Sequence, residues 1–465
     1  MPQQPANPEP VPDFDSMLSR KFGKEVANYF SGSPLNRVGF LRGDHQFLTQ
    51  ALKHPSTDFL LCNELQPLVK TEAKDRLAWV KFDDVKGVVG EDPYKSTEGE
   101  MLGLYNSTTY VPQMIFLGID EKAQDALSYQ GKNMYKGAPR FAVDVTPRAS
   151  AKAECEKLIS SLQGRKLEFA KGRVMDVVAS DGTSAPTNEA PLTDPTVSPS
   201  SLARTGNPSA TPLTSLQAAI YAEARQLLDW NARNPFCAQC GQPTLSVNGG
   251  FKRTCPPKDL ARINSKSSTG VSNALSNVAE ANQDESSRPP CATRQGVSNL
   301  CFPRTDPTVI MAVVNHAGDR ILLGRQKRWP PYWYSTLAGF AEPAESIEEA
   351  VRREVYEEAG IYVGRVVIHS TQPWPYPANL MIGAVGQANP DGETVDLGND
   401  PELEVAKWFT FDEVREALRV GTSGLGEDAG AEYKEGGLRL PPSTAIANQL
   451  MTSVVNGFVS GQPKM

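Results

Sequence analysis

Three glutamates lie close together in the segment REVYEEAGI, at Glu354, Glu357 and Glu358. On an α-helix, residues three or four positions apart share a face, so these carboxylates are expected to point to one region. Like charges at that spacing repel and destabilise an isolated helix. Such a cluster of hard oxygen ligands makes sense where it holds Mg²⁺ or Mn²⁺, which bind carboxylates and water. The alternative is a solvated acidic helix face.

The helix that must carry these carboxylates has start and stop signals of its own. Ser346 followed by Glu349 is a capping-box pattern, which predicts that the helix begins at Ser346. Gly360 is a natural stop just after its last turn. Arg353 and Glu345 can pair across the junction between the helix and the loop before it. We therefore expect a loop held against a metal-binding helix.

A longer string surrounds this helix. From Gly339 to Ile361 the chain reads GFAEPAESIEEAVRREVYEEAGI, or G-x5-E-x7-R-E-V-Y-E-E-A-G-I. This string resembles the Nudix box at every fixed position. The Nudix family hydrolyses nucleoside diphosphates linked to some other moiety, using divalent metal. The resemblance therefore implies a metal-dependent hydrolase of a pyrophosphate bond.

A group of cysteines precedes this string. Two residues separate Cys237 from Cys240 and Gly241 follows, which is typical of half a zinc knuckle, and Cys255 is the expected third ligand. Cys291 and Cys301 are both available as the fourth, beyond a Ser- and Asn-rich stretch that reads as an insertion. The alternative is a set of unrelated reduced cysteines. Four thiolates would form a closed, structural zinc site.

A second string narrows the resemblance. TQPWPYPAN, from Thr371 to Asn379, is similar to the S-Q-P-W-P-F-P-x-S signature of the NADH pyrophosphatase branch of the Nudix hydrolases, with Thr, Tyr and Asn as its three departures. That branch also carries a four-cysteine zinc ribbon and a less regular N-terminal domain. Three prolines in this string predict a rigid loop, with a Pro-rich edge turn around a buried Trp as the alternative. The low-complexity inserts indicate a fungal-type member.

The resemblance assigns roles residue by residue. Catalytic roles fall on Glu345, Arg353, Glu354, Glu357 and Glu358, with Glu357 or Glu358 as the general base. The ligands of the catalytic Mg²⁺ or Mn²⁺ are the Ala338 carbonyl, Glu354, Glu358 and a downstream acid, Glu402, with Glu404 competing. The zinc ligands become Cys237, Cys240, Cys255 and Cys291. The substrate-binding residues are Phe302, Phe340, Gln372, Pro373, Trp374, Pro375, Tyr376, Pro377, Ala378, Asn379 and Ala447.

The chain has 465 residues, seven cysteines and a net charge of −7. That length allows two or three domains, and the charge gives no basic footprint of a dedicated nucleic-acid binder. No run is apolar enough to span a membrane, and the odd cysteine count without a signal peptide indicates a reducing compartment. The expected organisation is a disordered tail (1–15), an α/β N-terminal domain (16–178), a low-complexity linker (179–213), a helix and zinc ribbon (214–302, with an insertion at 258–288) and a Nudix domain with a mixed sheet between helices (303–465).

The implied reaction is hydrolysis of NADH, and of NAD⁺ and related dinucleotides, to nicotinamide mononucleotide and AMP. One alternative is a hydrolase of NAD-capped RNA that uses the same site. The other is a non-catalytic protein whose zinc ribbon contacts a partner, against which the intact carboxylate set argues. The resemblance implies a homodimer. The C-terminal tripeptide Pro463-Lys464-Met465 shares the basic middle and apolar end of a peroxisomal S-K-L signal, with the cytoplasm as the alternative location.

Overall fold

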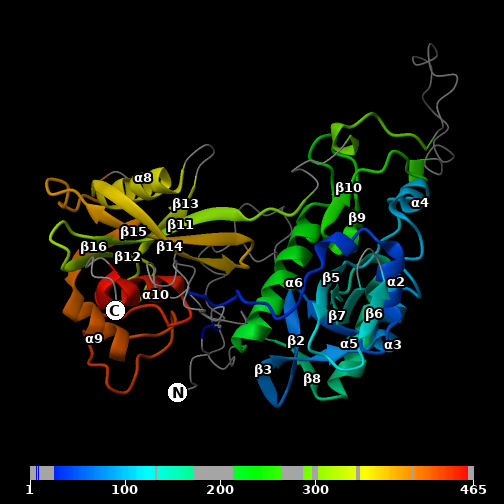
Figure 1. Cartoon of the computed structure of the whole chain (residues 1–465), viewed down its shortest axis with the longest axis horizontal. Coiled ribbons are helices and arrows are strands. Elements are labelled where there is room, and N and C mark those ends of the chain that lie inside the picture. The colour runs from blue at the N-terminus through cyan, green and yellow to red at the C-terminus, as the bar shows by residue number, and fades with distance from the viewer. Residues whose placement is uncertain are drawn as a thin grey trace, which may run out of the picture. The chain divides into compact units, whose positions relative to one another are not determined.

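The computed structural model describes residues 7, 9, 26–130, 134–170, 213–262, 286–295, 302–341, 346–398 and 402–458. The described residues of Met1–Ser33, Lys171–Ala222 and Thr305–Met465 form one compact unit, and those of Pro34–Ala170 and Glu223–Arg304 form a second (Figure 1). The predicted tail and linker lie almost wholly outside the described residues, so the predicted domain boundaries stay predictions. Among the described helices, none has the length and apolar character needed to cross a bilayer.

The first unit is built on a six-stranded mixed sheet. Its strands are β11 (Asp306–Val314), β12 (Arg320–Gln326), β13 (Leu337–Phe340), β14 (Val363–Trp374), β15 (Asn379–Ala388) and β16 (Leu403–Thr410). They follow the order β14-β15-β11-β12-β16, with β13 added to β11. β11 and β15 run parallel, whereas the other pairs are antiparallel. β11 and β12 form a hairpin, with Gly318 at positive φ in its turn.

Helices cover both faces of this sheet (Figure 1). α8 (Ile347–Ala359) buries Val351 and Val355 against β11. α10 (Ile446–Ser453) packs on the opposite face, where Ile446 and Leu450 approach Gly383 of β15. The expected mixed sheet between helices is therefore confirmed.

The first unit also contains a helix that the sequence analysis did not predict, α9 (Phe411–Val420). Thr410 accepts a hydrogen bond from the Glu413 amide, while the Glu413 carboxylate accepts from the Thr410 amide. This is the same capping box that was recognised at α8, so the signal was present in the sequence.

The second unit combines an eight-stranded sheet, helices and a small two-stranded ribbon. The sheet consists of β1 (Asp58–Asn63), β2 (Gln66–Lys70), β3 (Ala73–Leu77), β4 (Trp79–Val80), β5 (Met114–Asp120), β6 (Leu127–Gln130), β7 (Met134–Asp144) and β8 (Leu167–Phe169). The helices are α2 (His45–Lys53), α3 (Phe82–Val89), α4 (Glu98–Gly103) and α5 (Lys152–Gln163), and the ribbon is β9 (Leu245–Val247) with β10 (Lys252–Thr254). α6 (Ser215–Arg233) precedes the ribbon in sequence. The helix predicted before the zinc ribbon is confirmed as α6.

One segment of the second unit differs from what its sequence pattern indicates. RLAWVKFDDV reads as a strand by itself, but the extended backbone ends at Val80 and α3 begins at Phe82. The Asp84 carboxylate accepts a hydrogen bond from the Lys81 amide at 3.1 Å, which satisfies a free donor at the helix start. The helix-start signal of the Asp84 carboxylate therefore determines the structure of this segment, although the alternating apolar residues before it favour a strand.

Candidate active site and zinc centre

α8 presents its carboxylates as its sequence predicted. The Ser346 hydroxyl accepts from the Glu349 amide, the Glu349 carboxylate accepts from the Ser346 amide, and Gly360 ends the helix in the left-handed conformation. The predicted capping box and stop are both confirmed. The Glu354 side chain is 13% exposed and that of Glu357 is 44% exposed, so the acidic face lies only partly in solvent. Glu358 is buried.

The strand β13 passes directly against the Glu354 carboxylate. A Cβ placed on Gly339 would lie under 3.0 Å from the Glu354 carboxylate atoms, a separation that real Cβ atoms essentially never show. Only a glycine lets the backbone at Ala338 and Gly339 approach the acid this closely. The carboxylates and the main-chain carbonyl offer hard oxygen ligands, so this donor set fits a Mg²⁺ or Mn²⁺ ion.

Arg353 ties the helix to the strand. Its Nη1 donates to Glu354 Oε1 at 2.8 Å and to Glu357 Oε2 at 2.9 Å, and its Nη2 donates to the Phe340 carbonyl at 2.8 Å. Glu345, its predicted partner, lies outside the described residues. Arg353 thus fixes two of the carboxylates with respect to β13.

Charge accumulates around Glu354. Burial raises the pKa of the Glu354 carboxyl, and repulsion from Glu357 and Glu402 adds to the rise, while Arg353 opposes it. Glu402 therefore acts electrostatically on Glu354, and its role as the downstream metal ligand stays a prediction. The competing acid, Glu404, is paired with Arg325 instead. A bound divalent cation would relieve the same repulsion.

The second signature string is a strand and a turn. Thr371 to Trp374 continue β14, Pro375 to Ala378 form the turn, and Asn379 starts β15. The expectation of a rigid loop is therefore wrong for Pro373 and Trp374, which are still part of the strand. β14 lies at the edge of the sheet, where the missing N–H of Pro373 costs no ladder bond.

The side chains of this hairpin differ widely in their exposure to solvent. Gln372, Trp374, Pro375 and Asn379 are buried, whereas Pro373, Tyr376, Pro377 and Ala378 are partly exposed. The hydrogen bonds seen at the Gln372 side chain all join it to protein groups, Tyr29, Thr444 and Ile446. The predicted substrate contacts of this string stay predictions, and the partly exposed residues have the access that they require.

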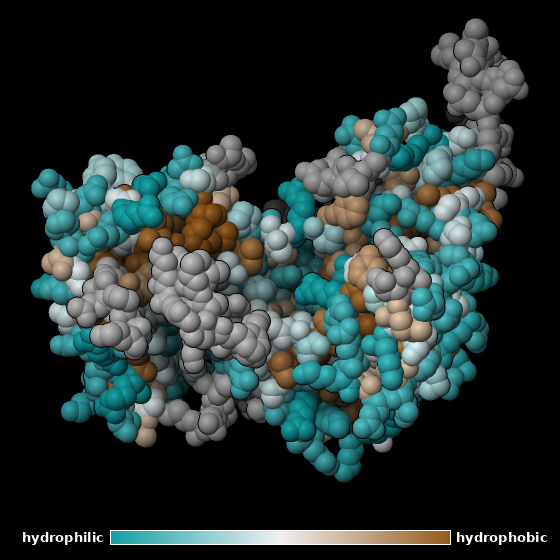
Figure 2. All heavy atoms as spheres, viewed as in Figure 1, coloured by the Kyte–Doolittle hydropathy of each residue, from teal (hydrophilic) through white to brown (hydrophobic). Residues whose placement is uncertain are grey.

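Phe340 lies on the opposite face of the sheet from the carboxylates. Successive residues of a strand point to opposite faces, and Gly339 faces Glu354. Phe340 pairs with Thr308, Thr308 pairs with Met381 and Met381 pairs with Gln372, so Phe340 and Trp374 share a face. Phe340 is 37% exposed. Figure 2 shows a patch of strongly apolar side chains on the part of the surface where the sheet of the first unit lies in Figure 1.

The two other residues predicted to contact the substrate are placed differently. Ala447 is buried in the first turn of α10. Phe302 belongs to the second unit. Their roles stay predictions.

Four thiols converge in the ribbon of the second unit. The sulfur atoms of Cys237, Cys240, Cys255 and Cys291 all lie within 4.8 Å of one another. Two of the separations are 3.7 Å (Cys237 to Cys291) and 3.5 Å (Cys240 to Cys255). A tetrahedral ion with Zn–S bonds of about 2.3 Å requires sulfur atoms roughly 3.8 Å apart, so the thiols fit Zn²⁺. Cys301, the competing ligand, lies outside the described residues.

Arg294 and Thr293 contact two of the thiols without belonging to the set of four. Arg294 Nη2 donates to Cys255 Sγ at 3.3 Å, and its Nε donates to the Cys255 carbonyl at 2.9 Å. The Thr293 hydroxyl lies 3.0 Å from Cys291 Sγ. Partners of this kind orient metal ligands and tune their charge.

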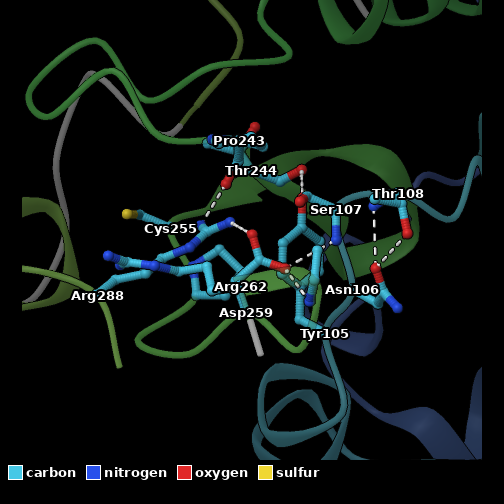
Figure 3. A network of polar contacts seen from close by, with 12 residues as sticks. Tyr105, Asn106, Ser107, Thr108, Pro243, Thr244, Cys255, Asp259, Arg262 and Arg288 are labelled. Atoms are coloured by element: carbon cyan, nitrogen blue, oxygen red, sulfur yellow. Dashed lines mark hydrogen bonds and ion pairs between the residues drawn. The ribbon is translucent and has the colours of Figure 1, made fainter. Parts of the chain in front are cut away.

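A buried ion pair links the segment that follows Cys255 to the segment that precedes Cys291. Asp259 and Arg288, both nearly inaccessible, are paired, and Asp259 also accepts from the Ser107 amide at 3.0 Å (Figure 3). The Arg288 guanidinium lies over the Tyr105 ring at 5.0 Å. The Asp259 amide donates to the Ser286 carbonyl and the Arg288 amide to the Pro257 carbonyl. The predicted insertion at 258–288 is thus closed at its base.

Comparison with known proteins identifies the family to which the chain belongs. Family models match as a NUDIX domain (residues 304–425), an NADH pyrophosphatase zinc ribbon domain (232–259) and an NADH pyrophosphatase-like rudimentary NUDIX domain (56–230). The chain is 31% identical to the NAD-capped RNA hydrolase NUDT12 of Homo sapiens over 92% of this chain and 73% of that protein. The chain belongs to the NADH pyrophosphatase branch of the Nudix hydrolases.

Further relatives of this Nudix hydrolase agree. It is 30% identical to the NAD-capped RNA hydrolase NPY1 of Saccharomyces cerevisiae over 93% of this chain and 96% of that protein. It is 32% identical to the mitochondrial NAD(P)H pyrophosphatase NUDT13 of Homo sapiens, over 51% and 55% of the two chains. The expected fold and the expectation of a diphosphatase are confirmed, and the alternative of a non-catalytic protein is not supported.

Sequence reasoning missed several residues that shape this Nudix hydrolase. Asp259 and Arg288 gave no signal, because an isolated acid and an isolated arginine are ordinary surface residues. Arg294, three residues after Cys291, could have been found as a cation close to a ligand. Residues 26–33 were expected in the N-terminal domain, yet they belong to the unit that contains the Nudix domain.

Proposed function

We propose that this enzyme hydrolyses the pyrophosphate bond of NADH to reduced nicotinamide mononucleotide and AMP. The observation that carries the proposal is the Glu354 carboxylate pressed against Gly339 and tied to β13 by Arg353. This cluster offers hard oxygen ligands on one face of the sheet, and the partly exposed Phe340 lies on the other face, at the end of the same strand. The relatives named as NAD(P)H pyrophosphatases and the matching zinc ribbon support the choice of a nicotinamide dinucleotide.

The residues have separate tasks in this reaction. Glu354, Glu358, Glu402 and the Ala338 carbonyl would hold Mg²⁺ or Mn²⁺. Such an ion, when bound, neutralises diphosphate charge and lowers the pKa of water. Arg353 keeps two carboxylates in place, and Glu357 or Glu358 accepts the proton of the attacking water. Phe340 and Tyr376 offer aromatic faces on which a base can stack.

A substrate panel tests this proposal. NADH, NAD⁺, ADP-ribose and a nucleoside triphosphate are each incubated with the enzyme and Mg²⁺ or Mn²⁺, and the products are identified by mass. We expect AMP and the reduced mononucleotide from NADH, and no turnover after chelation of the metal. Preferred cleavage of the triphosphate, or equal rates after chelation, contradicts the proposal.

A second candidate substrate is RNA with a 5′ nicotinamide cap. It is favoured by the relatives named NAD-capped RNA hydrolases, which match over most of this chain. The same carboxylates would cleave the cap, and the net charge of −7 gives little general attraction to a long polyanion. Competition between NADH and a capped transcript, with an uncapped transcript as control, separates the two. Efficient cleavage of the transcript at low concentration would favour the cap.

Quaternary structure and location are also proposed. We expect a homodimer, which light scattering coupled to size-exclusion chromatography measures directly.

We also propose peroxisomal residence through Pro463-Lys464-Met465, which lies outside the described residues. A fluorescent fusion with a free C-terminus should give puncta that vanish when Lys464 and Met465 are deleted. Diffuse signal in both versions would favour the cytoplasm.

A further inference from the structure

A short segment near the N-terminus of the chain packs on the signature hairpin. Asn28 is buried, and its Nδ2 donates to the Ser370 hydroxyl at 3.1 Å and to the Thr371 carbonyl at 2.9 Å. These two residues lie where β14 enters the signature string. The segment therefore contacts the hairpin through specific donors rather than through apolar packing alone.

Gln372 extends this contact to a third part of the chain. Its amide nitrogen donates to the Tyr29 carbonyl at 3.1 Å and to the Thr444 carbonyl at 2.8 Å, while its oxygen accepts from the Ile446 amide at 3.0 Å. One buried side chain thus joins the N-terminal segment, β14 and the start of α10. Loss of any partner would leave a buried polar group unpaired, which is costly.

Phe30 fixes the aromatic part of the hairpin. Its ring meets that of Trp374 edge to face, with centroids 5.9 Å apart, and that of Tyr376 at 6.2 Å. The Trp374 and Tyr376 rings are themselves 5.7 Å apart. Phe30 has a φ of 71°, a left-handed conformation that bulky residues rarely adopt. The turn that aims its ring is closed by a bond from the Ser31 amide to the Asn28 carbonyl at 3.1 Å.

We propose that Asn28, Phe30 and Gln372 are positioning residues for the substrate-binding turn Pro375–Ala378. They hold Trp374 and Tyr376 at fixed angles, so that the partly exposed Tyr376 is ordered before the dinucleotide binds. Ordering a binding surface in advance lowers the entropy cost of binding. This inference rests on the proposed function for its kinetic consequence, but the packing that it invokes is independent of the substrate.

The kinetic test uses the full chain with three substitutions. Phe30→Leu keeps an apolar side chain and removes the ring contacts, so the KM for NADH should rise about three- to tenfold, the scale of one aromatic pair. The kcat should change less than about twofold, because the carboxylates are untouched. Phe30→Tyr should restore the KM. Phe40→Leu, which removes an exposed ring that contacts Tyr135 in the other unit, should leave both constants unchanged.

A second measurement is independent of turnover. Asn28→Asp keeps the size of the side chain and removes both donated hydrogen bonds. Hydrogen exchange of the amides between Thr371 and Asn379 should then become at least about threefold faster, with β12 unchanged as the internal control. If wild type fails to cleave NADH, the proposed function fails and this measurement still tests the positioning role. An unchanged KM in Phe30→Leu, or unchanged exchange in Asn28→Asp, overturns the inference.

Discussion

The Glu354 carboxylate occupies the space beside Gly339 that any side chain at residue 339 would need. Helix α8 and strand β13 are therefore closer at this point than two residues with side chains would allow. This close approach brings the backbone of the strand next to the carboxylates that are proposed to bind the catalytic metal. Gly339, the first residue of the Nudix-box string, therefore has a structural role, because it leaves room for the Glu354 carboxylate.

Replacing Gly339 with Ala should reduce turnover far more than stability. The new methyl group must push the Glu354 carboxylate aside, which is cheap for the end of a flexible side chain but moves it away from β13. We expect kcat to fall at least about 10²-fold, with a small change in Tm. Gly99→Ala is the matched control, because nothing lies within 4 Å of its Cβ position. Activity near that of wild type in Gly339→Ala would contradict a role for this close approach.

Glu358→Gln keeps the size of the side chain but removes one negative charge from the cluster. If the cluster holds the catalytic metal, kcat should fall by about 10²–10⁴, whereas the KM for NADH should change far less. Steady-state kinetics at saturating Mg²⁺ measure both constants, and Glu348→Gln in the first turn of the same helix is the control. Turnover within about threefold of wild type would overturn the mechanism.

The purified protein should contain about one Zn²⁺ per chain, bound by the four thiols. Metal analysis of Cys291→Ser should show zinc lost, and Cys301→Ser should keep it. Arg294→Ala should keep the stoichiometry but release zinc faster to a chelator, because the cation that faces Cys255 Sγ is gone. Full zinc in Cys291→Ser with loss in Cys301→Ser would make Cys301 the fourth ligand instead.

Stability should depend on pH through Glu223 on α6. Burial raises the pKa of the Glu223 carboxyl from 4.5 to about 7, although Arg37 lies 3.5 Å away and Arg42 also favours the charged form. The folded state keeps this proton at pH values where the unfolded chain has lost it. The free energy of unfolding should therefore fall by up to about 3 kcal/mol as the pH rises from 4.5 through 7.

The neutral variant Glu223→Gln isolates this effect. It cannot ionise, so its Tm relative to wild type should increase between about pH 5 and about pH 8. Thermal scans at several pH values measure the difference. Glu121→Gln, at an exposed position of the same unit, should show no such trend. A Tm difference between Glu223→Gln and wild type that does not change with pH would mean that burial does not raise the pKa of this carboxyl.

The sequence by itself determined the features that depend on neighbours along the chain. The spacing of the three glutamates from Glu354 to Glu358 determined that they share a helix face. Ser346 and Gly360 determined where that helix begins and ends, and Gly360 has a φ of 69°, a conformation that glycine adopts at little cost. The spacing of Cys237 and Cys240 determined half of the metal site. These features follow from local backbone geometry, in which a helix repeats every 3.6 residues and a cap needs one side chain.

Only the tertiary structure decided which distant segments meet. It placed Asn28 and Phe30 on the signature hairpin and paired Asp259 with Arg288 across the base of the insertion. Each of these contacts joins residues far apart in the chain, and their formation depends on the packing of whole sheets and helices rather than on local propensity. The same reason explains why Pro373 was expected in a loop. A proline excludes a central strand but not an edge strand, and the position of β14 at the edge is a property of the complete sheet.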